Sequence, residues 1–276
     1  MAHQAERSDN GDAGLARLRR ELLRLERVVV AFSGGADSAF LAWMAHDTLG
    51  AGGARVVTAV SPSLAPEEAR DCADLAAEWG LRWEPVATDE LADPAYAVND
   101  GQRCAHCKMA LMAALAPVAT AEGATVVLGV NLDDLGDHRP GQAAAAERGA
   151  RFPLVDAGFT KADVRAASRA LGLRTWDKPA AACLASRVPY GTSVTLGVLQ
   201  EVATAESALR NLGFRQLRVR HYGDLARVEL PVADLGGAIA RREEVVAAVR
   251  SAGYRYVTLD LEGFRTGNLN AGLPAT

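Results

Sequence analysis

The sequence predicts an α/β protein, with a Rossmann-like parallel-sheet domain followed by a smaller C-terminal α+β domain. Short apolar strands alternate with helical patterns through the first part of the 276-residue chain, as in a parallel sheet covered on both faces. The first strand runs into a glycine-rich turn, "SGGADS". An irregular stretch, 174–193, then separates this part from a second set of helices and strands. We therefore expect domains at 1–175 and 176–276.

Apolar spacing and capping residues define the elements of the first domain. Four leucines between residues 15 and 25 recur at helical spacing and predict a leading amphipathic helix. Pro66 starts a later helix that Gly80 ends, and Thr160 with Asp163 three residues on caps another. The predicted strands are 28–32, 55–60, 81–87 and 125–130, and the further predicted helices are 37–49, 66–79, 108–121, 141–150 and 160–171.

The second domain begins after a stretch that fits neither a helix nor a strand. Pro179, Pro189 and Gly191 make "RTWDKPAAACLASRVPYGTS" irregular, and we interpret it as a functional loop between the domains. The elements predicted beyond it are a helix at 196–212, strands at 215–222 and 226–230, a helix at 242–251 and a strand at 254–259.

The composition indicates a folded protein without a field that attracts nucleic acid. The chain is 49% hydrophobic and 23% charged, and its net charge is −4. The polar start, "MAHQAERSDN", resembles no secretory signal, and no uninterrupted apolar run is long enough to span a bilayer. We expect a cytoplasmic protein whose four cysteines are thiols, with neither nucleic acid nor a membrane as a partner.

The glycine-rich turn has the residues of a phosphate site. Gly34 and Gly35 let the backbone turn tightly and bring N–H groups close to an anion, at the positive end of the following helix. Ser33 and Ser38 add hydroxyl donors. Asp37 would repel a phosphate directly, so we expect its carboxylate to hold Mg²⁺ on the phosphates. An ordinary strand–turn–helix corner is the alternative, which this combination of residues disfavours.

Three of the four cysteines are candidate metal ligands. Cys104 and Cys107 form a C-x-x-C, Cys183 lies in the irregular stretch, and Cys72 sits within a predicted helix, where we expect core packing. Three thiolates can hold a [4Fe–4S] cluster and leave one iron open to a non-protein ligand. Zinc is the alternative, although His106 is awkwardly placed between the two cysteines to bind the same ion. We favour the cluster on ligand type.

The motifs together resemble a known family. "SGGADS" resembles the signature of the PP-loop ATP pyrophosphatases. The series "AFSGGADS", "RCAHCK", "GVNLDDLGDHRPG", "ACLASRVPYG", "LRVRHYGDLARVELP" and "GYRYVTLDLEGFRTG" resembles the LarE family across nearly the whole chain. The glycine motif marks only the superfamily, whereas "CLASRVPYG" with "RVR…ARVELP" is much more specific.

The resemblance implies a chemistry and a set of site residues. LarE proteins are ATP-dependent sulfurtransferases of nickel-pincer cofactor biosynthesis: ATP adenylates a carboxylate of pyridinium-3,5-biscarboxylic acid mononucleotide, and sulfur then displaces AMP to leave a thiocarboxylate. The implied ATP-binding residues are Ser33, Gly34, Gly35, Asp37, Ser38, Asn131, Asp133, Asp134, Asp137 and Arg139. The implied substrate-binding residues are Ser186, Arg187, Arg218, Arg220 and Arg265, and the implied catalytic residues are Asp37, Cys183, Glu206 and Glu229.

The residues themselves support part of this assignment. Arg218 and Arg220 alternate on one predicted strand and so share a face, which suits a phosphate, with a solvated face as the alternative. Three aspartates between residues 133 and 137 follow the carboxyl end of a predicted strand, which suits the binding of a metal ion and phosphates. An ordinary polar loop is the alternative. For Arg187 the alternative is a surface ion pair, and Glu206 could simply belong to the polar face of its helix.

The chain departs from some members of the family. Those members carry a sacrificial cysteine at the position of Ala182 and lack the C-x-x-C, so this chain resembles the three-cysteine branch, which uses an iron–sulfur cluster. We therefore predict ATP, Mg²⁺ and a [4Fe–4S] cluster as cofactors. Gly237 stands where some members have an aspartate, which puts metal binding at that position in doubt.

Other functions remain open from the sequence. Net charge and the 5% aromatic content argue against a related tRNA thiolase. An amide-forming ATP pyrophosphatase that uses ammonia would leave the cysteines without a role. A non-catalytic nucleotide- or zinc-binding module would release no pyrophosphate. The family resemblance implies a homo-oligomer, a ring-like hexamer, whose partners are a small-molecule nucleotide and sulfide or another sulfur donor.

Overall fold

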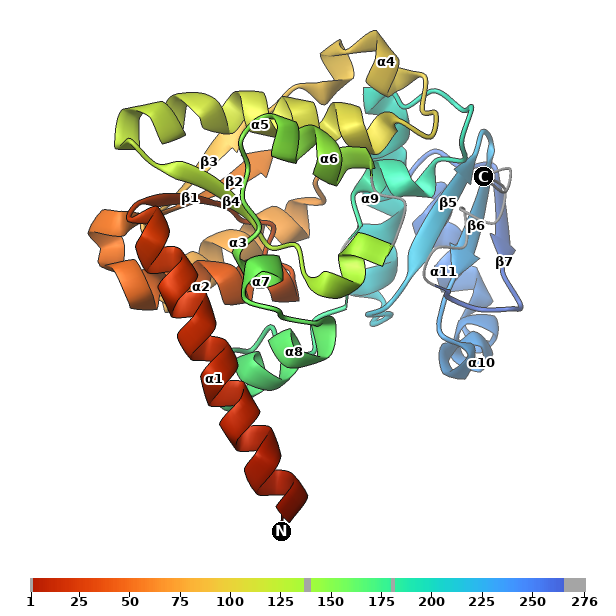
Figure 1. Cartoon of the computed structure of the whole chain (residues 1–276). Coiled ribbons are helices and arrows are strands. Elements are labelled where there is room, and N and C mark those ends of the chain that lie inside the picture. The colour runs from red at the N-terminus through yellow and green to blue at the C-terminus, as the bar shows by residue number, and fades with distance from the viewer. Residues whose placement is uncertain (1, 137–139, 180–181, 266–276) are drawn as a thin grey trace. The chain divides into compact units, whose positions relative to one another are not determined.

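A computed structural model of the chain describes residues 2–136, 140–179 and 182–265 (Figure 1). Its contacts divide the chain into two compact units. The first comprises Met1–Ser61, Pro66–Asp89 and Cys104–Ala181; the second comprises Pro62–Ala65, Glu90–Arg103 and Ala182–Thr276. Two short segments from the N-terminal half thus pack with the C-terminal part. The domain boundary that we expect after residue 175 stays a prediction.

The first unit contains the predicted parallel sheet. Its strands are β1 (Val28–Ala31), β2 (Ala54–Val60), β3 (Trp83–Ala87) and β4 (Thr125–Leu128), in the order β3-β2-β1-β4 and all parallel. The order reverses between β1 and β4. In open parallel sheets ligands bind beyond the carboxyl ends of the strands at such a reversal.

Helices cover both faces of this sheet, as the alternating pattern predicts (Figure 1). Val28 and Val30 point into one core, and Val29 between them points into the other. On the first face lie α1 (Ala2–Leu25), α2 (Ala36–Gly53), α3 (Pro66–Glu78), α7 (Pro153–Asp156) and α8 (Lys161–Ala170); on the second lie α5 (Arg103–Glu122) and α6 (Pro140–Glu147).

Helix α5 starts earlier than the sequence indicates. We predict a helix from residue 108, but α5 begins at Arg103, so the whole C-x-x-C is helical. Among the described residues, α5 is also the one helix whose length and composition would suit a membrane span, with 17% of its apolar window buried. A single such helix is weak evidence for membrane insertion.

The second unit is the predicted α+β domain. Strands β5 (Arg218–Tyr222) and β6 (Leu225–Glu229) are antiparallel, and β7 (Tyr256–Leu259) pairs in parallel with β6. The α-helices and 3₁₀ turns of this unit are η1 (Glu90–Ala92), α4 (Pro94–Ala97), η3 (Leu184–Arg187), α9 (Leu196–Asn211), α10 (Val232–Ala240) and α11 (Arg242–Arg250). Helices α9 and α11 pack with the strands around Val219, Val228 and Leu209.

Candidate active site

The glycine turn in the first unit has the backbone of an anion site. Gly34 has φ of 69°, a left-handed conformation that glycine adopts without strain. A methyl group added there would also lie 3.0 Å from Sγ of Cys72, which is fully buried as we predict. Gly35 caps α2 and supplies no side-chain hydrogen bond to it. The first-turn N–H groups of α2 therefore point at the space beyond the turn.

The two serines of the turn form hydrogen bonds within it. Oγ of Ser38 lies 3.1 Å from Oγ of Ser33 and accepts a hydrogen bond from the Ser33 backbone N–H at 3.2 Å. The same hydroxyl donates to the Gly35 carbonyl at 3.2 Å. Both hydroxyls thus shape the turn in this structure, and rotation of a hydroxyl is enough to present either one to a phosphate oxygen.

A second group of predicted residues meets the turn at the end of β4. Asn131 donates its side-chain N–H to Oδ1 of Asp37 at 3.2 Å, and its own backbone N–H donates to Oδ2 of Asp134 at 3.1 Å. The approach is close because residue 129 is glycine: a Cβ there would lie 2.7 Å from the Ser38 nitrogen. Strand order therefore brings Asp37 and Asn131 together across the reversal point.

Lys161, which sequence reasoning missed, joins this group. Its ammonium forms an ion pair with Oδ2 of Asp37, and its backbone N–H donates to Oδ2 of Asp133 at 2.7 Å. Thr160 and Asp163 form the predicted capping box and fix the start of α8, so Lys161 occupies the first turn of that helix. The capping box locates the helix start but carries no information about which strand end the next side chain reaches.

Two predicted ATP-binding residues, Asp137 and Arg139, lie outside the described residues.

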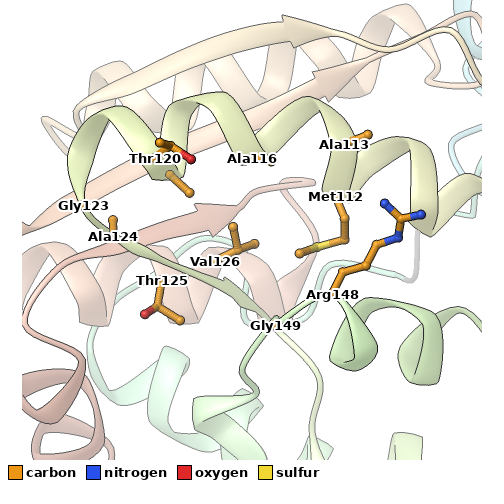
Figure 2. Close-up of a pocket in the computed structure, with 11 residues that line it drawn as sticks. Met112, Ala113, Ala116, Thr120, Gly123, Ala124, Thr125, Val126, Arg148 and Gly149 are labelled. Atoms are coloured by element: carbon orange, nitrogen blue, oxygen red, sulfur yellow. The ribbon is translucent and has the colours of Figure 1, made fainter.

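The first unit contains a hollow of about 640 Å³ that is lined by α5, the start of β4 and residues 148–149. Figure 2 shows the side chains that line it. Thr125 and Val126 on its wall belong to the amino end of β4, whereas Asn131 follows the carboxyl end. The hollow is therefore separate from the glycine turn.

In the second unit, Arg187 and Glu206 form a buried, two-point ion pair. Nε of Arg187 donates to Oε1 of Glu206 at 2.8 Å and Nη2 donates to Oε2 at 3.0 Å, with side chains 3% and 0% exposed. Nη1 of Arg187 donates to the carbonyls of Ala182 and Cys183 at 2.6 and 3.0 Å. The guanidinium thus holds the backbone of Cys183, and Glu206 is its counter-ion.

Arg220 and Glu229 repeat this arrangement. Nη2 and Nε of Arg220 donate to Oε2 of Glu229 at 2.8 and 3.0 Å, and Nη1 donates to the Ser186 carbonyl at 2.8 Å. Arg227 also donates to Glu229, at 3.0 Å. Two of the predicted substrate ligands, Arg187 and Arg220, therefore also support the loop that carries Ser186 and Cys183.

The buried carboxylate of Glu206 makes the stability of the fold depend on pH. Burial alone would raise the pKa of Glu206, but the charge and hydrogen bonds of Arg187, with Arg210, hold it below its ordinary value of 4.5. A carboxyl with a lowered folded-state pKa stabilises the fold above its unfolded pKa, and that stabilisation is lost as pH falls through the folded value.

We expect Glu206→Gln to destabilise the protein by about 3–5 kcal/mol at pH 7, because it leaves Arg187 buried without a counter-ion. The difference from wild type should shrink as pH falls below 4.5, because the unfolded wild-type chain then binds a proton at Glu206 that the folded carboxylate, with its lowered pKa, resists. Urea unfolding at pH 7 and pH 3.5 measures it. The surface variant Glu122→Gln, which removes an ion pair with Arg82, is the control. An equal difference at both pH values would contradict the prediction.

Arg218 stands in a positive environment. Burial, the positive charge of Arg187 and that of Arg220 and Arg210 lower its pKa to about 10, although Glu206 opposes them. Its guanidinium stacks over the Phe264 ring at 5.1 Å. It remains charged at neutral pH, and an anionic group bound beside it would relieve the repulsion among these cations. The arrangement is suited to a phosphate or a carboxylate.

Arg218→Met should therefore weaken binding of a phosphate-bearing substrate while leaving the protein folded. Loss of one charge-assisted contact costs on the order of 1.5–3 kcal/mol, or roughly tenfold to a hundredfold in Kd. ATP should bind as in wild type, since none of the residues proposed to hold it lies on β5. Calorimetric titration with each ligand tests this. Equal losses for both ligands would show that Arg218 does not belong to the second substrate's site.

The remaining predicted residues are placed as follows. Arg265 is exposed and forms an ion pair with Glu262. Cys104 and Cys107 lie one turn apart on α5 in the first unit, and Cys183 caps η3 in the second. None of these three cysteines is in a disulfide, and their side chains are exposed or half-exposed. No group of three or more His, Cys, Asp or Glu side chains in the described part of the chain forms a metal site. The shared cluster stays a prediction.

Comparisons with known proteins connect this geometry to a family. No family model matches the chain. It is 46% identical over 263 residues to an uncharacterised protein of Synechocystis, a match that covers 94% of this chain and 97% of that protein. It is 25% identical over 251 residues to an uncharacterised protein of Methanocaldococcus jannaschii, a match that covers 90% of this chain and 94% of that protein.

A third relative has a named activity. The pyridinium-3,5-bisthiocarboxylic acid mononucleotide synthase of Lactiplantibacillus plantarum is 41% identical over 247 residues, which cover 89% of this chain and 90% of that protein. Such identity over nearly the full length of both chains agrees with the parallel sheet, the glycine turn and the second α+β unit described above. The chain therefore belongs to the LarE family, of which that synthase is a member.

Proposed function

We propose that this protein is an ATP-dependent sulfurtransferase that adenylates pyridinium-3,5-biscarboxylic acid mononucleotide and converts the carboxylate to a thiocarboxylate. The relative's name supplies the product class. The observation that carries the proposal is the meeting of Asp37 and Asn131 beside the glycine turn, at the carboxyl ends of β1 and β4. Backbone donors, a helix N-terminus and a carboxylate at one point suit the phosphates of ATP.

The groups around Asp37 fit a bound Mg²⁺. Carboxylate and amide oxygens are hard ligands, and Asp37, Asn131 and Asp134 supply them within one hydrogen-bonded group. When bound, Mg²⁺ would neutralise charge on the phosphates. The Lys161 ammonium now occupies one side of Asp37, and it can pass to a phosphate oxygen as the metal binds. The α2 N-terminus would then stabilise the departing pyrophosphate.

The second unit supplies the site for the other substrate. Arg218 retains a charge that burial and neighbouring cations disfavour, and the substrate carries carboxylates and a phosphate. Adenylation gives the reacting carboxylate a leaving group, AMP, which a sulfur nucleophile then displaces. Glu206 and Glu229 remain predicted catalytic residues; in this structure their carboxylates hold Arg187 and Arg220, which in turn hold the Cys183 loop.

The cysteines fit a cluster by their chemistry. Cys104 and Cys107 share one helix face at i and i+3, and both, like Cys183, are at least partly accessible and outside any disulfide. A [4Fe–4S] cluster on these three would carry the transferred sulfide on its fourth iron. Zinc would occupy the same thiolates without supplying sulfur. Gly237, where some members have an aspartate, lies in α10 and provides no ligand.

A substrate panel tests the adenylation step. The protein is incubated with Mg²⁺, ATP and one of three acceptors: the biscarboxylated mononucleotide, bulk tRNA, or a simple carboxylate with ammonia. We expect AMP and pyrophosphate only with the mononucleotide. Product with tRNA would establish the tRNA thiolase instead, product with ammonia would establish an amide-forming enzyme, and no pyrophosphate with any acceptor would indicate a binding module.

A cytoplasmic homo-oligomer, a ring-like hexamer, is also part of the proposal, on family resemblance alone. Sulfide or another sulfur donor is the proposed second partner.

A further inference from the structure

The loop that follows Cys183 is fixed by a side chain far away in the sequence. Nδ2 of Asn99 donates to the carbonyls of Pro189 and Thr192 at 2.8 and 2.9 Å and lies 3.3 Å from that of Val188. The Asn99 carbonyl accepts the Gly191 N–H at 3.1 Å. One fully buried asparagine therefore contacts four positions of the 188–192 turn.

Arg103 extends this contact toward Cys183. Its Nη1 donates to Oδ1 of Asn99 and, at 2.9 Å, to the Ala185 carbonyl. The guanidinium also stacks over the Tyr190 ring at 5.6 Å, and the residue is 5% exposed. A buried guanidinium normally has a carboxylate partner, as Arg187 and Arg220 do. Arg103 binds neutral oxygens and an aromatic face instead.

Three arginines thus hold one short stretch of backbone. Arg187 binds the carbonyls of Ala182 and Cys183, Arg103 binds that of Ala185, and Arg220 binds that of Ser186. They come from the loop itself, from the 90–103 segment and from β5, and all belong to the second unit. The carbonyls are therefore fixed from three directions, which restrains the backbone that carries the Cys183 side chain.

The backbone at residue 99 supports a specific role for this contact. Asn99 has φ of 60°, a left-handed conformation that costs a non-glycine residue energy unless its surroundings require it. Asparagine is among the residues that tolerate it best. Here the side chain gains hydrogen bonds to carbonyls 89 to 93 residues away in the chain.

We propose that Asn99 and Arg103 are positioning residues for the Cys183 loop, which they hold in the orientation that substrate binding and sulfur transfer require. The claim that these residues hold the loop rests on the contacts above, and the claim that substrate binding needs them rests on the proposed function. The two residues touch no substrate; they act through the carbonyls of the loop that carries Cys183, Ser186 and Arg187. Neither is among the site residues that the motifs indicate.

Three variants of the full-length protein test the proposal. Asn99→Gly keeps the left-handed backbone and removes the side-chain bonds. Arg103→Met keeps the stem and removes the guanidinium, and Arg103→Lys keeps a charged donor for the two oxygens but not the planar group that stacks over Tyr190. Arg82→Met, which removes a half-exposed ion pair with Glu122 in the other unit, is the matched control.

Hydrogen exchange gives the structural readout. The amides of Gly191 and Val194, which donate to the carbonyls of Asn99 and Ala97, should exchange at least tenfold faster in Asn99→Gly and Arg103→Met. Amides of β5 and β6 should stay within twofold of wild type, which shows that the unit remains folded. Wild-type exchange at both loop amides in both variants would overturn the proposal.

Steady-state kinetics gives the functional readout. With ATP and the mononucleotide, we expect KM for the mononucleotide to rise at least tenfold in Asn99→Gly and Arg103→Met and less in Arg103→Lys, with KM for ATP within twofold. A wild-type KM for the mononucleotide in both Asn99→Gly and Arg103→Met, or equal losses for the two substrates, would overturn the positioning role. Failure of the wild type to form AMP would contradict the proposed function alone, and the exchange result would still decide the structural part.

Discussion

Asp37→Ala should lower the rate of AMP and pyrophosphate formation roughly a thousandfold, because metal-based stabilisation of phosphate charge contributes several kcal/mol. The carboxylate contacts Asn131 and Lys161 at the turn and belongs to no core cluster. The fold should therefore survive. The measurement is pyrophosphate release with saturating ATP and mononucleotide, alongside a thermal melt.

The same helix offers a matched control. Asp47 also lies on α2 but forms a surface ion pair with Arg19, away from the turn. Asp47→Ala should keep the wild-type rate. Adenylation by Asp37→Ala at near the wild-type rate would show that the glycine turn does not bind the metal–phosphate group.

Replacement of Cys104, Cys107 or Cys183 by alanine should abolish sulfur transfer yet leave adenylation within a few-fold of wild type. A [4Fe–4S] cluster needs all three thiolates when the fourth iron is open, so each single loss should remove the bound iron. The residues proposed to bind ATP follow the carboxyl ends of β1 and β4 or lie on α2, and they include none of these cysteines. Anaerobic iron and sulfide analysis, with AMP formation measured on the same samples, checks both parts.

Cys72→Ala is the control for this series. Cys72 is fully buried in the core of the first unit, and burial raises its pKa to about 11, so it is a poor metal ligand. The variant should bind as much iron as wild type. Full iron content in any of the other three alanine variants would contradict a cluster held by those cysteines, and zinc in place of iron would favour the alternative metal.

Strand periodicity predicted the parallel sheet, whereas the assignment of Asn131 to the same site as Asp37 came from the family resemblance. The two side chains meet because the carboxyl ends of neighbouring parallel strands lie together. Strand periodicity also placed Arg218 and Arg220 on one strand face, and both lie on β5. These features follow from the side-chain period of two residues in strands and of about 3.6 residues in helices, together with the rule that parallel strands are joined by right-handed helical crossovers.

The partners of individual charged residues could not be predicted in this way. Lys161 reaches Asp37 across 124 residues, and Asn99 reaches Thr192 across 93. Such contacts depend on how separate segments pack, which no local pattern encodes. Helix α10 was missed for a different reason: Gly236 and Gly237 lie inside it, and glycine is a poor helix former.

The early start of α5 shows the same limit on a smaller scale. Residues 103–107 carry no apolar stripe that would extend the predicted helix, yet Arg103 is held by Asn99 and Ala185. Tertiary hydrogen bonds thus fix the first turn, which contains the C-x-x-C.

The fate of Cys183 during turnover tests the central claim most directly. Anaerobically prepared protein is given ATP, Mg²⁺, sulfide and the biscarboxylated mononucleotide, and both the nucleotide products and the intact protein are weighed by mass spectrometry. We predict several thiocarboxylates per protein chain, one AMP for each, and an unchanged protein mass. Dehydroalanine at residue 183, with at most one thiocarboxylate per chain, would contradict a replenished sulfur donor, and absence of thiocarboxylate would contradict the sulfurtransferase itself.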